Sequence, residues 1–108
     1  MLKIPNSIKF VISDFDGIMT DNSVYIDNNH NITRKINYKD IMGIVILKRA
    51  GINTIFVSGE TNPIIDMLTE RFNLPENHQN IRKKIDILKD IIQRYDLKEN
   101  EYLYIGDD

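Results

Sequence analysis

The sequence predicts an α/β fold with a mostly parallel sheet flanked by helices. Three short apolar runs of β-type residues end in acidic or hydroxyl side chains, at Asp14, Ser58 and Asp107. Helical patterns lie between these runs, and this alternation favours right-handed βαβ crossovers. The 108 residues allow a real core and at most one domain, but they are few for a complete doubly wound fold, so we expect 1–108 to form a single Rossmann-like unit.

The first strand is predicted over 10–13, an uncharged β-type run that leads directly into Asp14. Two further β-type runs, at 24–26 and 32–36, flank a cluster of asparagine and aspartate. Such clusters tolerate positive φ angles and favour turns. We therefore expect residues 24–37 to form a β-hairpin with a polar tip, projecting as a flap after the first strand.

The middle of the chain predicts a helix, a buried strand and a second helix. The first helix is expected to start at Asp40 as the N-cap residue and to stop before Gly51. The strand over 52–57 ends at Ser58. Asn62 is the predicted N-cap residue of the next helix, since a proline follows it at the first helical position.

The last third of the chain predicts three more elements. A short strand lies between 76 and 81, a helix runs from Arg82 to about Tyr95, and a buried strand covers 102–105. Lysines at the amino end of that helix oppose its macrodipole. Their placement therefore favours an anion nearby, such as a phosphate beside Asp14.

The composition argues against several function classes. The net charge of −2 gives no electrostatic reason to expect nucleic acid or an anionic membrane as a partner. Without cysteine there is no disulfide framework, thiolate nucleophile or zinc–thiolate site. No segment approaches the ~20 apolar residues of a membrane span, and the first residues do not resemble a secretory signal. We expect a cytoplasmic protein with a small-molecule substrate.

The acidic strand ends predict a site for magnesium and a phosphate group. Because ligands bind beyond the carboxyl ends of parallel strands, Asp14, Asp16 and Asp107 are placed for chemistry. Carboxylates from two strand ends favour Mg²⁺, which keeps phosphate oxygens among its ligands. The chemistry that this suits is phosphoryl transfer, in which Asp14 attacks phosphorus and Asp16 protonates the leaving alkoxide. Ser58 and Lys84 would then hold the phosphoryl oxygens.

These residues also resemble the motifs of the haloacid dehalogenase-like (HAD) hydrolase superfamily. Within it, the small hairpin without a large cap domain and the runs 37–44 and 79–84 resemble the 3-deoxy-D-manno-octulosonate 8-phosphate phosphatase group. That group includes acylneuraminate 9-phosphate phosphatases and the phosphatase-like domain attached to some acylneuraminate cytidylyltransferases. The segments that resemble the four superfamily motifs are, in order, Asp14-Phe15-Asp16-Gly17-Ile18-Met19-Thr20-Asp21, Ser58-Gly59, Lys84 and Gly106-Asp107-Asp108.

The resemblance implies a Mg²⁺-dependent phosphatase that acts on a sugar-acid phosphate, as in sialic-acid or lipopolysaccharide biosynthesis. It implies Asp14 as the phosphorylated nucleophile and Asp16 as the acid and base. It implies Mg²⁺ held by Asp14, the Asp16 backbone carbonyl and Asp107, with Asp108 as a further candidate at the metal. It also implies a homotetramer in which each hairpin helps to cover a neighbour's site. The implied phosphate-binding residues are Ser58, Gly59 and Lys84.

Departures from the group bear on the substrate. Glu60 follows Ser58-Gly59 where the octulosonate enzymes usually have arginine, and it is more similar to the nonulosonate branch. We therefore expect a nonulosonate 9-phosphate in preference to octulosonate 8-phosphate, with Glu60 and Asp40 as candidate substrate contacts. The family usually continues beyond Gly-Asp-Asp into a further strand and a closing helix. We thus expect a HAD-like domain that stops after the fourth strand of its sheet.

Two alternatives stay open at this point. A phospho-receiver domain also gathers acids, a hydroxyl and a lysine around Mg²⁺, but it accepts phosphate on an aspartate at a central strand end, where this chain has Ser58. The other alternative is a catalytically impaired oligomerisation or regulatory module linked to an acylneuraminate cytidylyltransferase. Hydrolysis of a simple phosphate ester separates an enzyme from such a module.

Overall fold

The computed structural model describes residues 7–16, 18–20 and 24–106, and its elements follow the predicted order. Among these residues no helix is long and apolar enough to cross a membrane. The elements are β1 (Phe10–Asp14), β2 (Val24–Ile26), β3 (Ile32–Arg34), α1 (Tyr38–Arg49), β4 (Asn53–Val57), α2 (Pro63–Arg71), β5 (Asn77–His78), α3 (Lys84–Arg94) and β6 (Tyr102–Ile105).

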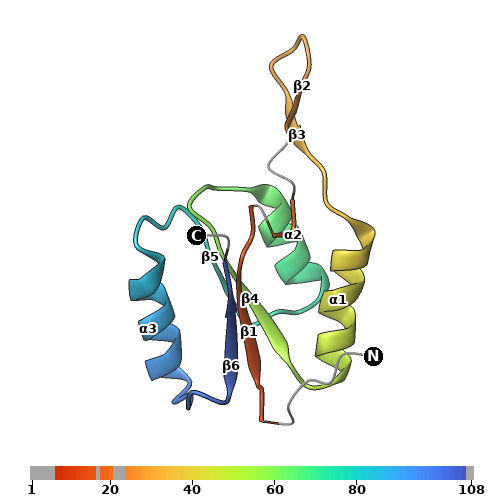
Figure 1. Cartoon of the computed structure of the whole chain (residues 1–108). Coiled ribbons are helices and arrows are strands. Elements are labelled where there is room, and N and C mark those ends of the chain that lie inside the picture. Colours follow the sequence, from red (N-terminus) through yellow and green to blue (C-terminus); the bar gives the residue numbers. More distant parts are fainter. Residues whose placement is uncertain (1–6, 17, 21–23, 107–108) are drawn as a thin grey trace.

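Four strands form one parallel sheet in the order β5-β4-β1-β6. In β1, Asp14 pairs with Val57 of β4, and Ser13 pairs with Ile105 of β6. Figure 1 shows α1 and α2 on one face of this sheet and α3 on the other. The α/β fold with a parallel sheet and flanking helices is thus confirmed. The carboxyl ends of β1, β4 and β6 lie side by side, where an open α/β sheet binds its ligands.

Each face of the sheet has its own apolar core, because successive side chains of a strand point to opposite faces. On the α1 and α2 face, the rings of Phe15 and Phe56 meet edge to face with centroids 5.4 Å apart. On the α3 face, Ile55 and Val57 of β4 pack with Ile91 of the helix. The buried central strands therefore give the acids at the end of β1 a rigid support.

Asparagine side chains fix where α1 and α2 begin. Asn62 accepts a hydrogen bond from the Ile64 backbone N–H over 3.0 Å, so it is the N-cap of α2 as predicted. The N-cap of α1 is Asn37, which accepts from the Lys39 backbone N–H over 2.8 Å. The predicted N-cap at Asp40 was wrong, since Asn37 starts the helix earlier and Asp40 lies in its first turn.

Strand β6 lies where the sequence predicts it, but it is not buried as expected. Leu103, Tyr104 and Ile105 are 39 to 47% exposed. Their exposure follows from the strand order, since β6 is an edge strand of this sheet. An apolar β-type run reveals a strand, whereas its burial depends on which elements flank it.

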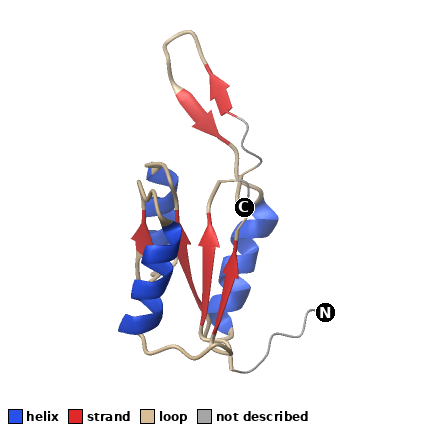
Figure 2. Cartoon of the chain, turned by 60° about the vertical axis from the view of Figure 1, so that its left-hand side comes forward, coloured by secondary structure: helices blue, strands red, loops and turns tan. Residues whose placement is uncertain are grey.

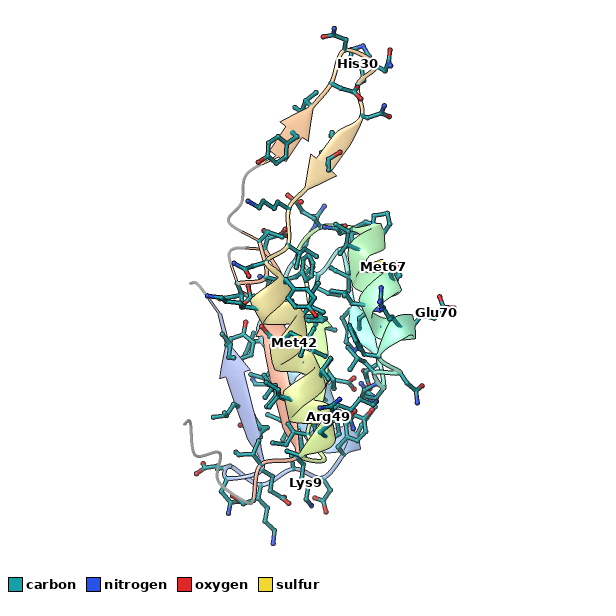
Figure 3. The ribbon with its side chains drawn as sticks, turned by 90° about the vertical axis from the view of Figure 1, so that its right-hand side faces the viewer. Lys9, His30, Met42, Arg49, Met67 and Glu70 are labelled. Carbon is teal, nitrogen blue, oxygen red and sulfur yellow. The ribbon has the colours of Figure 1, made fainter. Side chains whose placement is uncertain are left out.

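The predicted hairpin forms from β2 and β3, which pair antiparallel. Its turn is held by Asp27, whose side chain accepts hydrogen bonds from the backbone N–H groups of Asn29 and Asn31, over 2.8 and 3.0 Å. His30 lies at the tip with a φ of 66° (Figure 3). Figure 2 shows the hairpin projecting beyond the carboxyl ends of the sheet. Its second strand ends at Arg34, two residues earlier than predicted.

Candidate active site

Asp14 is the buried centre of the site. It is the last residue of β1, and its side chain has no exposure to solvent. Tyr104 of the neighbouring strand β6 donates its phenol hydrogen to Asp14 Oδ1 over 3.0 Å. Lys84 Nζ lies 3.1 Å from Asp14 Oδ2. Because burying a carboxylate is costly unless it is paired, these two contacts compensate for the position of Asp14.

Lys84 reaches this carboxylate from the first residue of α3. The N-cap residue of the helix is Lys83, and its side chain makes no capping hydrogen bond. The positive end of the helix macrodipole and the lysine charge therefore both lie near Asp14. The Asp14 carboxylate is thus an anion close to one of these lysines, as the sequence suggested, and the Lys84 side chain remains 27% exposed.

Asp16 and Ser58 form the second part of the site, next to Asp14. Ser58 Oγ donates to Asp16 Oδ2 over 3.3 Å, which joins the loop after β1 to the end of β4. Ser58 Oγ also accepts a hydrogen bond from the Glu60 backbone N–H over 3.1 Å. Ser58 is almost wholly buried, so this hydroxyl has a fixed position. The structure thus brings a carboxylate and a hydroxyl together at adjacent strand ends.

Gly59 and Glu60 lie on the exposed loop between β4 and α2. A Cβ atom at Gly59 would lie 3.6 Å from the Ile81 carbonyl oxygen, an ordinary contact, so packing alone does not require glycine there. The Glu60 carbonyl accepts a hydrogen bond from the Asn80 backbone N–H over 3.3 Å. This bond ties the loop to the segment that leads into α3 and Lys84.

The structure places Asp40 apart from these contacts. It is exposed in the first turn of α1, where it borders a cavity of about 190 Å³ between that helix and the sheet, with Gly43 and Ile105 in the same lining. Its role as a substrate contact stays a prediction. Asp107 and Asp108, the other predicted acids, lie outside the described residues.

The carboxyl half of α3 is anchored by Glu76, which lies just before β5. Arg94 donates to both carboxylate oxygens of Glu76, over 2.9 and 2.5 Å, and Tyr95 donates its hydroxyl over 2.6 Å. His78 also pairs with this carboxylate. The hydrogen bonds from Arg94 are the main cause that lowers the pKa of Glu76 to about 2. The charged network fixes the helix that carries Lys84.

Sequence reasoning missed two residues at this site, Tyr104 and Gly106. Tyr104 has the contact with Asp14 described above, and a Cβ atom at Gly106 would lie 3.2 Å from Asp14 Oδ2. Gly106 was recognised as part of a motif, but not as a close neighbour of the carboxylate. The pairing of β1 with β6 creates both contacts, and no local pattern in the sequence specifies that pairing.

The donor set fits a hard divalent cation in part. Asp14 Oδ2 is buried and accepts no hydrogen bond, so a lone pair of this oxygen is available to a cation. Oxygen ligands of this kind suit Mg²⁺. Among residues 7–16, 18–20 and 24–106, no three histidine, cysteine or acidic side chains gather closely enough to hold a metal ion. The third expected ligand, Asp107, is outside those ranges.

Comparison with known proteins finds phosphatases that are similar in sequence and in fold. The chain is 28% identical over 102 residues to 3-deoxy-D-manno-octulosonate 8-phosphate phosphatase KdsC of Haemophilus influenzae, which covers 94% of this chain. It also superimposes on the cobalt-bound structure of the octulosonate 8-phosphate phosphatase from that organism with a TM-score of 0.82 and 27% identity. The chain is thus similar to octulosonate 8-phosphate phosphatases, in sequence and in fold. That structure match covers 98% of this chain and 62% of the other.

A second octulosonate phosphatase structure shares the fold. The enzyme from Moraxella catarrhalis, solved with a magnesium ion, a phosphate ion and a KDO molecule, aligns with a TM-score of 0.85 and 23% identity. The alignment covers 95% of this chain and 59% of that one. No family model matches the chain. The chain spans 57% of the length of the curated Haemophilus influenzae relative.

Proposed function

We propose that this chain is a Mg²⁺-dependent phosphatase that hydrolyses a sugar-acid phosphate monoester through an aspartyl-phosphate. The observation that carries the proposal is the wholly buried Asp14 carboxylate at the end of β1, with Lys84 Nζ 3.1 Å from one of its oxygens. Asp16 and Ser58 lie at the same edge, 3.3 Å apart. A fixed carboxylate beside a cation is suited to attack a phosphate group whose charge the cation helps to offset.

Each residue has a distinct role in the proposed reaction. An oxygen of Asp14 forms a bond to phosphorus while the bond between phosphorus and the sugar oxygen breaks. Asp16 gives its proton to that departing alkoxide, and it then takes a proton from the water that hydrolyses the aspartyl-phosphate. Ser58 and Lys84 hold the phosphoryl oxygens, with the Gly59 backbone beside them. Phosphate ester hydrolysis needs the second acid because an alkoxide is a poor leaving group.

Magnesium is the cofactor of this proposal. Asp14, the backbone carbonyl of Asp16 and Asp107 would hold it, with Asp108 as a further candidate near the metal. When bound, Mg²⁺ offsets the repulsion between the phosphate and the attacking carboxylate. The buried Asp14 oxygen without a hydrogen bond supports this assignment, as does the magnesium ion in the Moraxella catarrhalis structure.

Two substrates compete within this proposal. The names of the relatives support 3-deoxy-D-manno-octulosonate 8-phosphate. Glu60 supports a nonulosonate 9-phosphate, because it places a negative charge where the octulosonate enzymes usually have a positive one. Glu60 lies on the loop that follows the phosphate-binding Ser58, so its charge would act on the part of the substrate near the phosphate. Asp40 stays a second candidate contact.

The hairpin supports a role in assembly as well. Tyr25, Ile26 and Ile32 are 59 to 66% exposed on a two-stranded sheet that projects from the domain. A lone hairpin is marginally stable in water, and exposed apolar side chains favour contact with another surface. A homotetramer in which hairpins cover neighbouring sites therefore remains part of the proposal. The second candidate function, an inactive assembly module, rests on the same surface.

Release of phosphate from an aryl phosphate tests the proposed function. The parent chain should turn over with Mg²⁺, and both chelation of the metal and Asp14→Asn should abolish the activity. No phosphate release by the parent, with Asp14→Asn unchanged from it, would contradict the enzyme, and a tetramer retained in that inactive sample would favour the assembly module. A screen of octulosonate 8-phosphate against nonulosonate 9-phosphates then decides the substrate. Equal rates on unrelated sugar phosphates would refute the preference for nonulosonates.

A further inference from the structure

Tyr104 contacts Asp14, but the proposed reaction gives Tyr104 no role. Tyr104 is paired with Ile12 in the register of β6 and β1, so Asp14 lies two residues further along the neighbouring strand. The phenol nevertheless donates to Asp14 Oδ1 over 3.0 Å. Its side chain must therefore extend along the sheet toward the carboxyl ends of the strands, where the site lies.

Gly106 provides the space through which the phenol reaches Asp14. A Cβ atom at this position would lie 3.0 Å from Tyr104 Cε1 and 3.3 Å from the Tyr104 hydroxyl. It would also lie 3.2 Å from Asp14 Oδ2. Carbon atoms make favourable contacts only from about 3.5 Å outward. The absence of a side chain at Gly106 thus allows Tyr104 and Asp14 to meet.

The two oxygens of Asp14 consequently have different surroundings. Oδ1 accepts the hydrogen bond from Tyr104. Oδ2 lies 3.1 Å from Lys84 Nζ and accepts no hydrogen bond. The carboxylate is therefore held at both oxygens, by the Tyr104 phenol at Oδ1 and by the Lys84 ammonium at Oδ2, and these two contacts together fix its orientation.

We propose that Tyr104 is a positioning residue: its phenol fixes the rotamer of the Asp14 carboxylate that attacks phosphorus. This inference rests on the proposed phosphatase function. Tyr104 contacts neither the phosphate nor the leaving group in this role. Removing its hydroxyl should therefore reduce the rate of the chemical step and leave the binding of substrate by Ser58 and Lys84 unchanged.

Tyr104→Phe tests the role because it removes the hydroxyl and keeps the ring. Tyr102→Phe is the matched control, since Tyr102 lies on the same strand and packs against the α3 face core. Two measurements are needed on the 108-residue chain. One is kcat and KM with an aryl phosphate and Mg²⁺. The other is the carboxyl ¹³C resonance of Asp14 without substrate, assigned by its loss in Asp14→Asn.

For Tyr104→Phe we expect kcat to fall by roughly 10- to 100-fold with KM within about twofold, since a hydrogen bond to a charged group is lost. The Asp14 resonance should shift in this variant and stay unchanged in Tyr102→Phe. An unshifted resonance would overturn the contact, and a shifted resonance with unchanged kcat would overturn the positioning role. Absence of turnover in the parent would instead overturn the phosphatase proposal, and the positioning role with it, while the resonance still decides the contact.

Discussion

Lys84 Nζ lies 3.1 Å from Asp14 Oδ2, and this ion pair joins the amino end of α3 to the carboxyl end of β1. The two residues are far apart in the sequence, on elements that meet only when the sheet and the helix have packed. The carboxylate is wholly buried, whereas the lysine is partly exposed. The pair therefore links the stability of the fold to the charge of the proposed nucleophile.

Lys84→Met should destabilise the chain by about 2 kcal/mol, because it leaves Asp14 buried with only its Tyr104 hydrogen bond. Urea unfolding at neutral pH measures this change. Lys83→Met is the control, since the adjacent lysine is exposed and should cost less than about 0.5 kcal/mol. Adding Asp14→Asn to Lys84→Met should recover most of the loss, and a double variant as unstable as Lys84→Met would contradict the pairing.

Glu60→Arg should shift substrate preference toward octulosonate 8-phosphate. The substitution reverses the charge on the loop after Ser58, and one charge contact near the phosphate corresponds to a change of roughly tenfold in relative kcat/KM. The measurement is the ratio of kcat/KM for octulosonate 8-phosphate and a nonulosonate 9-phosphate. Glu70→Arg, at an exposed position of α2, is the matched control (Figure 3). A ratio that changes equally in both variants would rule out a role for Glu60.

Glu76 should make the stability of the chain dependent on acid. Its pKa is lowered from 4.5 to about 2 in the folded protein, chiefly by hydrogen bonds from Arg94, with Tyr95 and His78 at the same carboxylate. A group with a depressed pKa stabilises the fold above its unfolded pKa, and this contribution is lost as pH falls from about 4.5 toward 2.

The corresponding experiment compares Glu76→Gln with the parent by urea unfolding at neutral pH and near pH 2. The variant should be less stable by about 1 to 2 kcal/mol at neutral pH, with the difference shrinking in acid. Glu99→Gln, at an exposed position, serves as the control and should follow the parent at both pH values. A difference that persists unchanged in acid would show that the charge of Glu76 is not its cause.

Gly106→Ala should lower activity, because the new Cβ atom would displace the Tyr104 ring or the Asp14 carboxylate. We expect kcat to fall at least tenfold with the aryl phosphate, in line with a small shift of the nucleophile. Gly43→Ala is the contrasting variant, since Gly43 lies inside α1 and a Cβ there meets nothing within 4 Å. It should keep full activity and gain about 0.5 to 1 kcal/mol of stability. Full activity in Gly106→Ala would contradict the close packing of Gly106 against Asp14 and Tyr104.

The order of strands and helices could be predicted because each element carries a local signal. The uncharged runs before Asp14 and Ser58 predict strands, and the Asn62-Pro63 pair predicts the start of α2, all of which the structure shows. Local signals also misled where two were present. Asn37 and Asp40 are both good N-cap residues, and only the structure shows that the helix starts at the first.

The part of the site that depends on strand pairing could not be predicted. Tyr104 meets Asp14 because β6 pairs with β1 and Gly106 leaves room, and neither relationship is encoded within one element. The exposure of β6 has the same origin, since an apolar run of four residues is compatible with a central strand or an edge strand. Burial and side-chain contacts across strands are tertiary properties.

Phosphorylation of Asp14 can be detected by acid quenching during turnover. The chain would be mixed with an aryl phosphate and Mg²⁺, quenched within one turnover, digested and analysed by mass spectrometry. We predict one phosphoryl group on the peptide that contains Asp14, and its absence in Asp14→Asn and when the metal is chelated. Turnover with no covalent phosphate on that peptide, or phosphate on another residue, would show that Asp14 is not the nucleophile.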